Sequence, residues 1–238
     1  MSTADSSPIL VVGGFASTPQ QYESLRQTLA ALSGQPTAIV PIGWLDWLAV
    51  VASDSYGALL GILDRAVRAT LATYAVGRLT LVTHSAGGVI ARIYVGDKPY
   101  GPRRLCYDGA RRVERLITLG TPHTTRGHGR QAGLNQITFA QQTYPGAYAP
   151  AVRYTSVIGK GVFGVADGPP PERGAWQSYQ MIAAEGAQWG DGVVPLANGL
   201  LDGSRQLVIP GLHHSQSGGH PWYGSSAEIV RAWWERAA

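Results

Sequence analysis

Residues 78–92 read RLTLVTHSAGGVIAR, and this stretch decides the fold of the chain. Its first half holds Leu79, Leu81 and Val82, a short apolar run that is typical of a buried strand. From residue 86 to 94 the large apolar residues recur at helical spacing. Ser85 stands between the two halves and is followed at once by small residues. The stretch therefore predicts a buried strand, a very tight turn that carries a serine, and a helix.

The residues around this serine nearly match the pattern G-x-S-x-G, in which a serine sits on a strained strand-to-helix turn with its hydroxyl exposed. Gly87 satisfies the second glycine, whereas Thr83 replaces the first. With its strand and helix, the turn resembles the nucleophile elbow of the α/β-hydrolase fold, and in particular of its lipase-like serine esterases. The resemblance implies that Ser85 is the catalytic nucleophile.

A second motif of this family stands near the start of the chain. Residues 8–12 (PILVV) form an all-apolar run, and Gly13-Gly14-Phe15 follows it. In the family, a strand that ends in Gly-Gly-aromatic supplies half of the oxyanion hole. The resemblance implies that the backbone N–H groups of Phe15 and Ala86 bind the oxyanion, with Gly14 in the pocket. An ordinary strand-to-helix turn is the alternative.

The acid of a serine–acid–histidine order is expected in residues 189–195 (WGDGVVP). This segment resembles the acid loop of lipase-like hydrolases, where an aspartate between small residues precedes a short apolar stretch. It implies Asp191 as the acid, although Asp-Gly is also a common turn pair. Asp167 and Asp202 are the rival positions.

The general base is expected near the end of the chain, because the histidine comes last in this fold. Residues 211–215 (GLHHS) and 221–224 (PWYG) resemble the family's histidine segment and imply His214 as the base. His213 and His220 are the alternatives. His84 precedes the serine, and His123 ends a lipase-like LGTPH segment at 119–123. We expect both of these histidines in the pocket or in the layer behind it.

The sequence gives no indication of a cofactor. It contains no HExxH spacing, no glycine-rich phosphate loop, and no histidine pair that is well spaced for chelation. We therefore expect neither a catalytic metal nor a cofactor, and a structural calcium stays open.

The whole chain of 238 residues suits one α/β domain, with 45% apolar and 14% charged residues. Alternating strands and helices predict a mostly parallel sheet with helices on both faces, and the opening antiparallel strands of larger hydrolases look to be missing. We expect a cap or lid at about 123–152 and a second excursion at about 159–190. Residues 43–48 (GWLDWL) and 159–174 are expected as loops.

The net charge of +4 comes largely from arginines between 103 and 115, and no aromatic or basic motif indicates nucleic-acid binding. The lone Cys106 excludes an internal disulfide. The start does not resemble a signal peptide, and no apolar run approaches the ~20 residues of a membrane span. These features predict a cytoplasmic protein without a transmembrane segment. Transient contact with a lipid surface and the oligomeric state stay open.

These motifs predict a serine esterase or lipase that acts on carboxylic esters of apolar acyl groups. The expected substrate is a small-molecule or lipid ester. Amidase, thioesterase or acyltransferase chemistry would use the same three residues. A catalytically silent hydrolase fold that serves as a binding protein is the remaining alternative.

Overall fold

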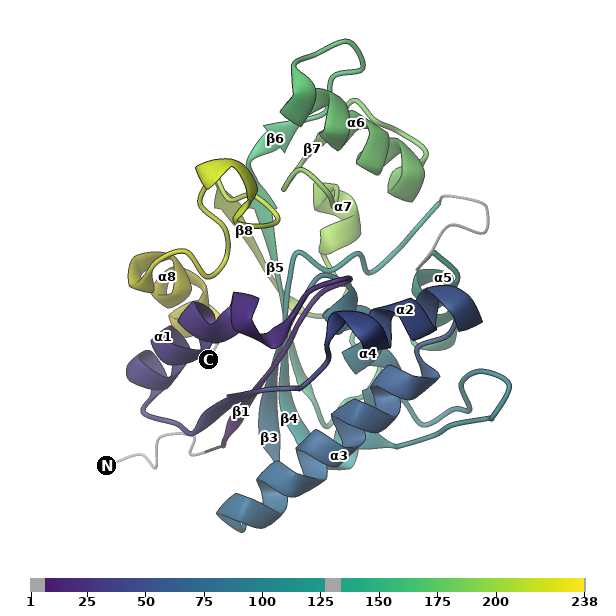
Figure 1. Ribbon diagram of the computed structural model, residues 1–238, viewed down its shortest axis with the longest axis vertical. Helices are drawn as coiled ribbons and strands as arrows, with labels where there is room; N and C mark the ends of the chain where they lie inside the picture. The colour runs from purple at the N-terminus through teal and green to yellow at the C-terminus, as the bar shows by residue number, and fades with distance from the viewer. Residues whose placement is uncertain (1–6, 127–133, 238) are drawn as a thin grey trace.

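A computed structural model describes residues 7–126 and 134–237 of the chain (Figure 1). Its centre is a parallel sheet of six strands in the order β2-β1-β3-β4-β5-β8. The strands are β1 (Ile9–Val12), β2 (Thr37–Ile39), β3 (Leu79–His84), β4 (Val113–Leu119), β5 (Arg153–Lys160) and β8 (Arg205–Pro210). All five strand pairs of this sheet are parallel, so the prediction of a mostly parallel sheet is confirmed.

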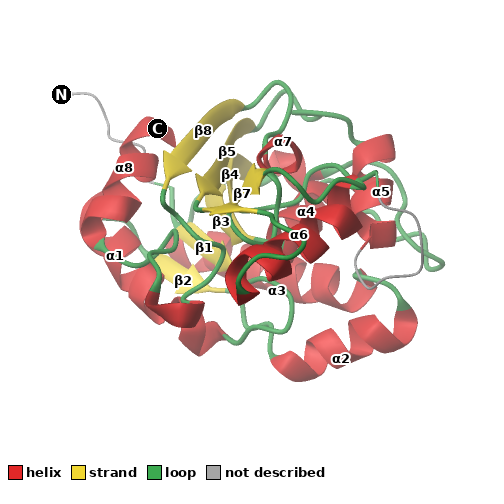
Figure 2. Cartoon of the chain, turned by 90° about the horizontal axis from the view of Figure 1, so that it is seen from above, coloured by secondary structure: helices red, strands yellow, loops and turns green. Residues whose placement is uncertain are grey.

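Helices cover both faces of the sheet (Figure 2). They are α1 (Glu23–Ser33), α2 (Trp44–Ser53), α3 (Gly57–Tyr74), α4 (Ala86–Val95), α5 (Leu134–Thr143), α6 (Pro170–Ala183), α7 (Leu196–Gly199) and α8 (Ala227–Ala237). Short 3-10 turns lie at Pro19–Tyr22, Gly109–Arg111 and Ser217–Gly219. The expected α/β architecture is confirmed.

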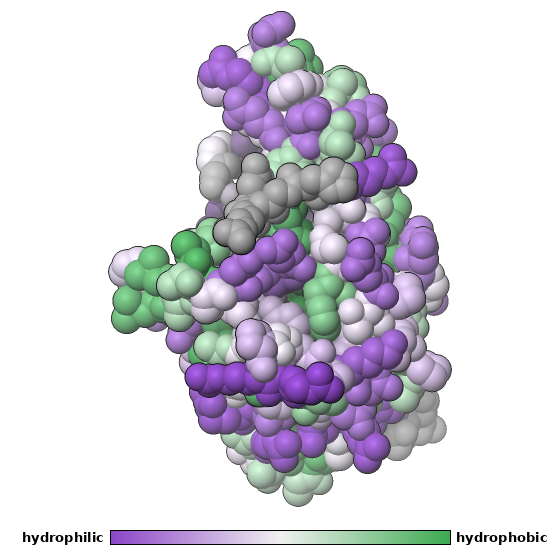
Figure 3. All heavy atoms as spheres, turned by 90° about the vertical axis from the view of Figure 1, so that its right-hand side faces the viewer, coloured by the Kyte–Doolittle hydropathy of each residue, from purple (hydrophilic) through white to green (hydrophobic). Residues whose placement is uncertain are grey.

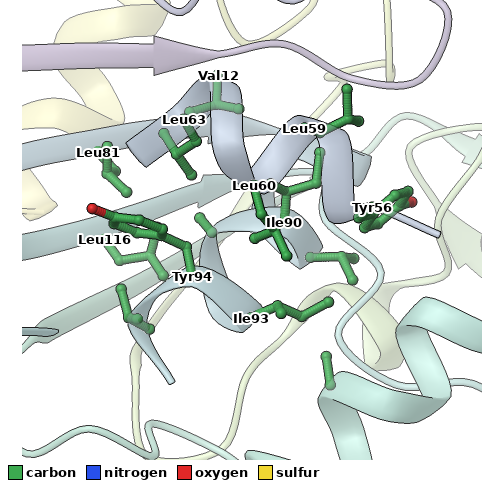
Figure 4. Packing of buried hydrophobic residues seen from close by; sticks show 14 of the residues in the cluster. Val12, Tyr56, Leu59, Leu60, Leu63, Leu81, Ile90, Ile93, Tyr94 and Leu116 are labelled. Carbon is green, nitrogen blue, oxygen red and sulfur yellow. The ribbon is translucent and has the colours of Figure 1, made fainter. Parts of the chain in front are cut away.

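The alternation of side chains along β1 shows how the two apolar layers arise. Leu10 and Val12 face the layer that packs under α3 and α4, whereas Ile9 and Val11 face the layer under α1 and α8. Successive side chains of a strand point to opposite faces, so an all-apolar strand fits only a sheet that is covered on both sides. Figure 4 shows Val12 beside Leu63 in the first layer.

The prediction of a loop at 43–48 is wrong, because α2 begins at Trp44. The carboxylate of Asp46 accepts a hydrogen bond from the Gly43 N–H at 2.8 Å and so stabilises the start of this helix. Trp47 and Val50, three residues apart, are buried against the core. A short helix with one buried face resembles an apolar loop in sequence, since only two of its residues report the period.

The predicted loop at 159–174 is also only partly correct. It contains β6 (Val162–Phe163), which pairs antiparallel with β7 (Trp189–Gly190), and α6 begins at Pro170, inside the predicted loop. Proline is favoured in the first turn of a helix, where its missing N–H has no partner to lose. In Figure 1 this small sheet and α6 stand above the main sheet.

The predicted cap at 123–152 contains α5, and part of it, residues 127–133, lies outside the described residues. Among the helices of the described chain, none combines the length and the apolar character needed to cross a lipid bilayer.

Candidate active site

Ser85 lies in the tight turn between β3 and α4. Its backbone has φ 52° and ψ −126°, a region that non-glycine residues rarely adopt and that stores strain. A Cβ on Gly87 would lie 2.6 Å from the Gly13 carbonyl oxygen, and one on Gly14 would lie 2.9 Å from the Ser85 Cβ. The end of β1 and the serine turn therefore pack backbone against backbone, which only glycines at these positions permit.

Thr83 occupies the place of the missing glycine as a regular residue of β3. It is fully buried, and its hydroxyl donates to the Ile117 carbonyl oxygen of the neighbouring strand at 3.2 Å. A threonine is therefore accommodated here because the adjacent strand offers a hydrogen-bond acceptor.

Three side chains from distant parts of the chain form one line of hydrogen bonds. The Ser85 Oγ lies 2.9 Å from His214 Nε2, and His214 Nδ1 lies 2.7 Å from an oxygen of Asp191. Ser85 follows β3, Asp191 follows β7, and His214 lies in the loop after β8. The structure thus brings together the three residues that the motif order singled out.

Asp191 is fully buried and is surrounded by donors. One carboxylate oxygen accepts the N–H groups of Val193 and Val194 at 3.0 and 2.8 Å, and the other accepts the Tyr223 hydroxyl at 2.7 Å. Burial raises the pKa of Asp191, but the adjacent His214 ring and these hydrogen bonds outweigh it, so the pKa lies below its ordinary value. Asp191 is therefore held as a carboxylate that can orient His214.

The rival histidines point elsewhere. The His213 ring stacks on the His220 ring with centroids 4.2 Å apart. Burial, followed by the neighbouring His220, lowers the pKa of His213. Since neighbouring residues of an extended loop face opposite ways, the contact of His214 with Ser85 turns His213 toward His220.

The expected oxyanion donors are the backbone N–H groups of Phe15 and Ala86. Ala86 is the first residue of α4, and the first N–H groups of a helix have no partner within it. Phe15 lines a cavity of about 340 Å³ that opens beside Ser85. The close packing of Gly14 on Ser85 places the two segments side by side.

A buried tyrosine and histidine link the loops on either side of the serine. The Tyr22 hydroxyl accepts the Gly14 N–H at 2.8 Å and lies 2.8 Å from His84 Nδ1. His84 Nε2 lies 2.9 Å from the His214 carbonyl oxygen. A carbonyl only accepts, so Nε2 carries the proton of His84, and the Tyr22 hydroxyl donates to Nδ1. Each partner then has one role, and the network ties the Gly14 loop to the His214 loop.

This network requires a neutral His84 ring. Burial lowers the pKa of His84 to about 3, and the neighbouring His214 ring adds to the shift. A second ring proton would give the Tyr22 hydroxyl two donors and no acceptor. His84 is thus a fixed structural link at neutral pH. It is among the residues that line the cavity beside Ser85.

We expect the Tyr22→Phe variant to lose about 1–3 kcal/mol of unfolding free energy, because the Gly14 N–H and His84 Nδ1 are left buried without a partner. We also expect kcat to fall about 10- to 100-fold with little change in KM. That loss is smaller than the about 10²–10³-fold loss that follows removal of an oxyanion donor itself. Thermal unfolding and steady-state kinetics measure the two effects.

Tyr94→Phe is the matched control, since it removes a hydroxyl that donates to Asp64 at 3.1 Å in the core. This variant should lose stability and keep its kcat. Equal kcat values in the two variants would show that Tyr22 supports the fold only.

Two further residues, His123 and Tyr223, are buried near the site. His123 is fully buried, hydrogen-bonded to the Thr118 hydroxyl at 2.9 Å, and is not among the residues that line the cavity beside Ser85. Tyr223 was missed as a functional residue, although the PWYG motif contains it. Its hydroxyl also accepts the Gly159 N–H at 2.9 Å, so it fixes Asp191 to the end of β5.

No group of three or more histidine, cysteine, aspartate or glutamate side chains suited to a metal ion occurs among residues 7–126 and 134–237.

No model of a known protein family matches the chain, and no curated protein does. Solved structures do resemble it. Phospholipase PlaB from Legionella pneumophila in complex with thio-NAD has a TM-score of 0.64 and 18% identity, over 97% of this chain and 58% of that chain. The product of gene lin2722 from Listeria innocua has a TM-score of 0.55 and 13% identity, over 97% and 93% of the two chains.

The present chain thus spans little more than half the length of the phospholipase chain. At these identities the likeness concerns the fold and not the activity. Together with the six-stranded parallel sheet and the helices on its two faces, it shows that this chain has the α/β-hydrolase fold.

Proposed function

We propose that this protein is a serine hydrolase that cleaves carboxylic esters through an acyl-enzyme on Ser85. The observation that carries the proposal is the unbroken line from the strained Ser85 through His214 to the buried Asp191. A serine hydroxyl is a weak nucleophile unless a base takes its proton, and the base needs an orienting carboxylate. The same geometry is compatible with thioesters and amides, which differ in the leaving group.

In the proposed reaction, His214 Nε2 takes the proton of Ser85 as the Oγ attacks the ester carbonyl. The carbonyl oxygen becomes an oxyanion, which the N–H groups of Phe15 and Ala86 stabilise. The tetrahedral adduct then breaks its bond to the alcohol oxygen, and His214 returns the proton to that oxygen. Water, deprotonated by His214, attacks the acyl-enzyme and releases the acid and the free Ser85 hydroxyl.

In this cycle Asp191 must stay ionised while His214 gains and loses a proton. The low pKa of Asp191 and the hydrogen bonds from the Val193, Val194 and Tyr223 groups support that role. The carboxylate then stabilises the imidazolium without taking its proton.

The test is labelling with a fluorophosphonate, followed by mass spectrometry of the labelled peptide and by assays on p-nitrophenyl esters. We expect one label, on Ser85, and ester turnover that the label abolishes. Labelling without ester turnover would move the proposal to thioesters or amides. Absence of any label would indicate a catalytically inactive protein with the α/β-hydrolase fold.

A further inference from the structure

The cavity beside Ser85 has a wall that indicates what kind of alcohol leaves. The leaving oxygen must lie within hydrogen-bond reach of His214 Nε2, because this atom gives it a proton. The cavity of about 340 Å³ is lined by His214 and also by Ser17, Gln21, Ser215 and Gln216. Its volume lies in the range of small-molecule sites, about 300–1,000 Å³. The alcohol therefore leaves into the part of this cavity that His214 lines.

The side chains of this wall are polar but uncharged. Hydroxyls come from Ser17 and Ser215 and amides from Gln21 and Gln216, whereas no aspartate, glutamate, lysine or arginine is among the described residues that line the cavity. The Ser17 hydroxyl donates to the Gly14 carbonyl oxygen at 2.6 Å and so accepts from a ligand, whereas glutamine amides both donate and accept, which suits the hydroxyl groups of an alcohol. A phosphate or carboxylate in the same place would have no cationic side chain to pair with.

Each of these exposed amides makes one internal hydrogen bond. Gln21 Oε1 accepts the Thr18 N–H at 2.8 Å, so the NH₂ group of Gln21 is the part of this amide left to donate to a ligand. Gln216 Nε2 donates to the Gln21 carbonyl oxygen at 3.4 Å, so the Gln216 carbonyl is the group left to accept from a ligand. The cavity thus offers a donor on Gln21 and an acceptor on Gln216, two residues that contact each other.

An apolar surface adjoins the cavity at Phe15, which is one of its lining residues. Phe15 is 49% exposed and contacts Trp47 of α2, with ring centroids 5.3 Å apart. On the outer face of α2, Trp44, Leu45 and Leu48 are 54%, 67% and 48% exposed. This helix lies at the front of Figure 1 and forms the projecting hydrophobic ridge at the left of Figure 3. An acyl chain that leaves the oxyanion donors on the Phe15 side meets this surface.

From the neutral polar wall we infer that the substrate is an acyl ester of an uncharged polyol, such as a glycerol or a sugar monoester. The acyl chain lies along Phe15 and α2, and the polyol lies between Gln21 and Gln216. The inference rests on the proposed ester hydrolysis and goes beyond it by naming the alcohol.

Four soluble hexanoyl esters test the inference: 1-hexanoylglycerol, 6-O-hexanoylglucose, ethyl hexanoate and hexanoyl lysophosphatidylcholine. They share one acyl group, so kcat/KM differs only through the alcohol. We expect at least one of the two polyol esters to exceed ethyl hexanoate by about tenfold or more, since a site that hydrogen-bonds a hydroxyl discriminates against an analogue that lacks it. The phosphocholine ester should not exceed the polyol esters.

The double variant Gln21→Leu, Gln216→Leu should reduce the ratio of kcat/KM between the polyol and the ethyl ester toward one. Gln180→Leu is the matched control, because Gln180 is exposed on α6 and does not line the cavity. It should keep the wild-type ratio.

A wild-type ratio near or below one would overturn the inference, as would a ratio that the double variant leaves unchanged. A preference for the phosphocholine ester would assign the cavity to a charged head group instead and would overturn it too. These outcomes leave ester hydrolysis standing. Absence of turnover on all four esters and on p-nitrophenyl esters would instead remove the proposed function.

Discussion

Replacing Ser85 with alanine should lower kcat for ester hydrolysis by about 10⁴- to 10⁶-fold, the range found when a serine hydrolase loses its nucleophile. The variant has no oxygen at the position 2.9 Å from His214 Nε2, so no acyl-enzyme forms. The free energy of unfolding should stay within about 1 kcal/mol, because alanine fills the same space in the turn. Hydrolysis of a p-nitrophenyl ester and thermal unfolding check both statements.

Ser33→Ala is the matched control. It also removes one serine hydroxyl, which donates to the Leu29 carbonyl oxygen at 2.6 Å near the end of α1. This variant should keep its kcat. If Ser85→Ala retained several per cent of the wild-type kcat in a preparation free of other hydrolases, another residue would be the nucleophile.

The order of the motifs allowed much of the site to be proposed from sequence. The sequence indicated a serine in a tight turn, an aspartate in a Gly-Asp-Gly loop and a histidine near the end. Ser85 and Asp191 are 106 residues apart along the chain, and Asp191 and His214 are 23 apart. Such assignments can be made because each motif is local: small residues around Ser85 and Asp191 indicate backbone geometry that larger side chains would obstruct. The structure then brings the three local motifs to one edge of the sheet.

The layer behind the site was not predictable in the same way. Tyr22 and His84 are 62 residues apart, and nothing in either local sequence indicates that their hydrogen bond joins the Gly14 and His214 loops. Tyr223 likewise reaches Asp191 across 32 residues. A single buried polar side chain has no periodic signal, since its partner is set by packing of whole elements.

The pair of adjacent histidines gives the last prediction. His214→Ala should lower kcat by about as much as loss of Ser85, because nucleophile and base act as one unit. His213→Ala should keep kcat within about tenfold, since its ring stacks on His220 and not on Ser85. Steady-state kinetics on one soluble ester separate the two variants.

Added imidazole supplies a further distinction. The ring missing from His214→Ala borders the cavity beside Ser85, so free imidazole can enter there and restore part of the rate. It should leave Ser85→Ala inactive, because that variant still has its base and lacks the nucleophile. A large loss of kcat in His213→Ala, together with a wild-type rate in His214→Ala, would reverse the assignment of the base. It would leave Ser85 as the nucleophile, with the His213 ring turned toward it during turnover.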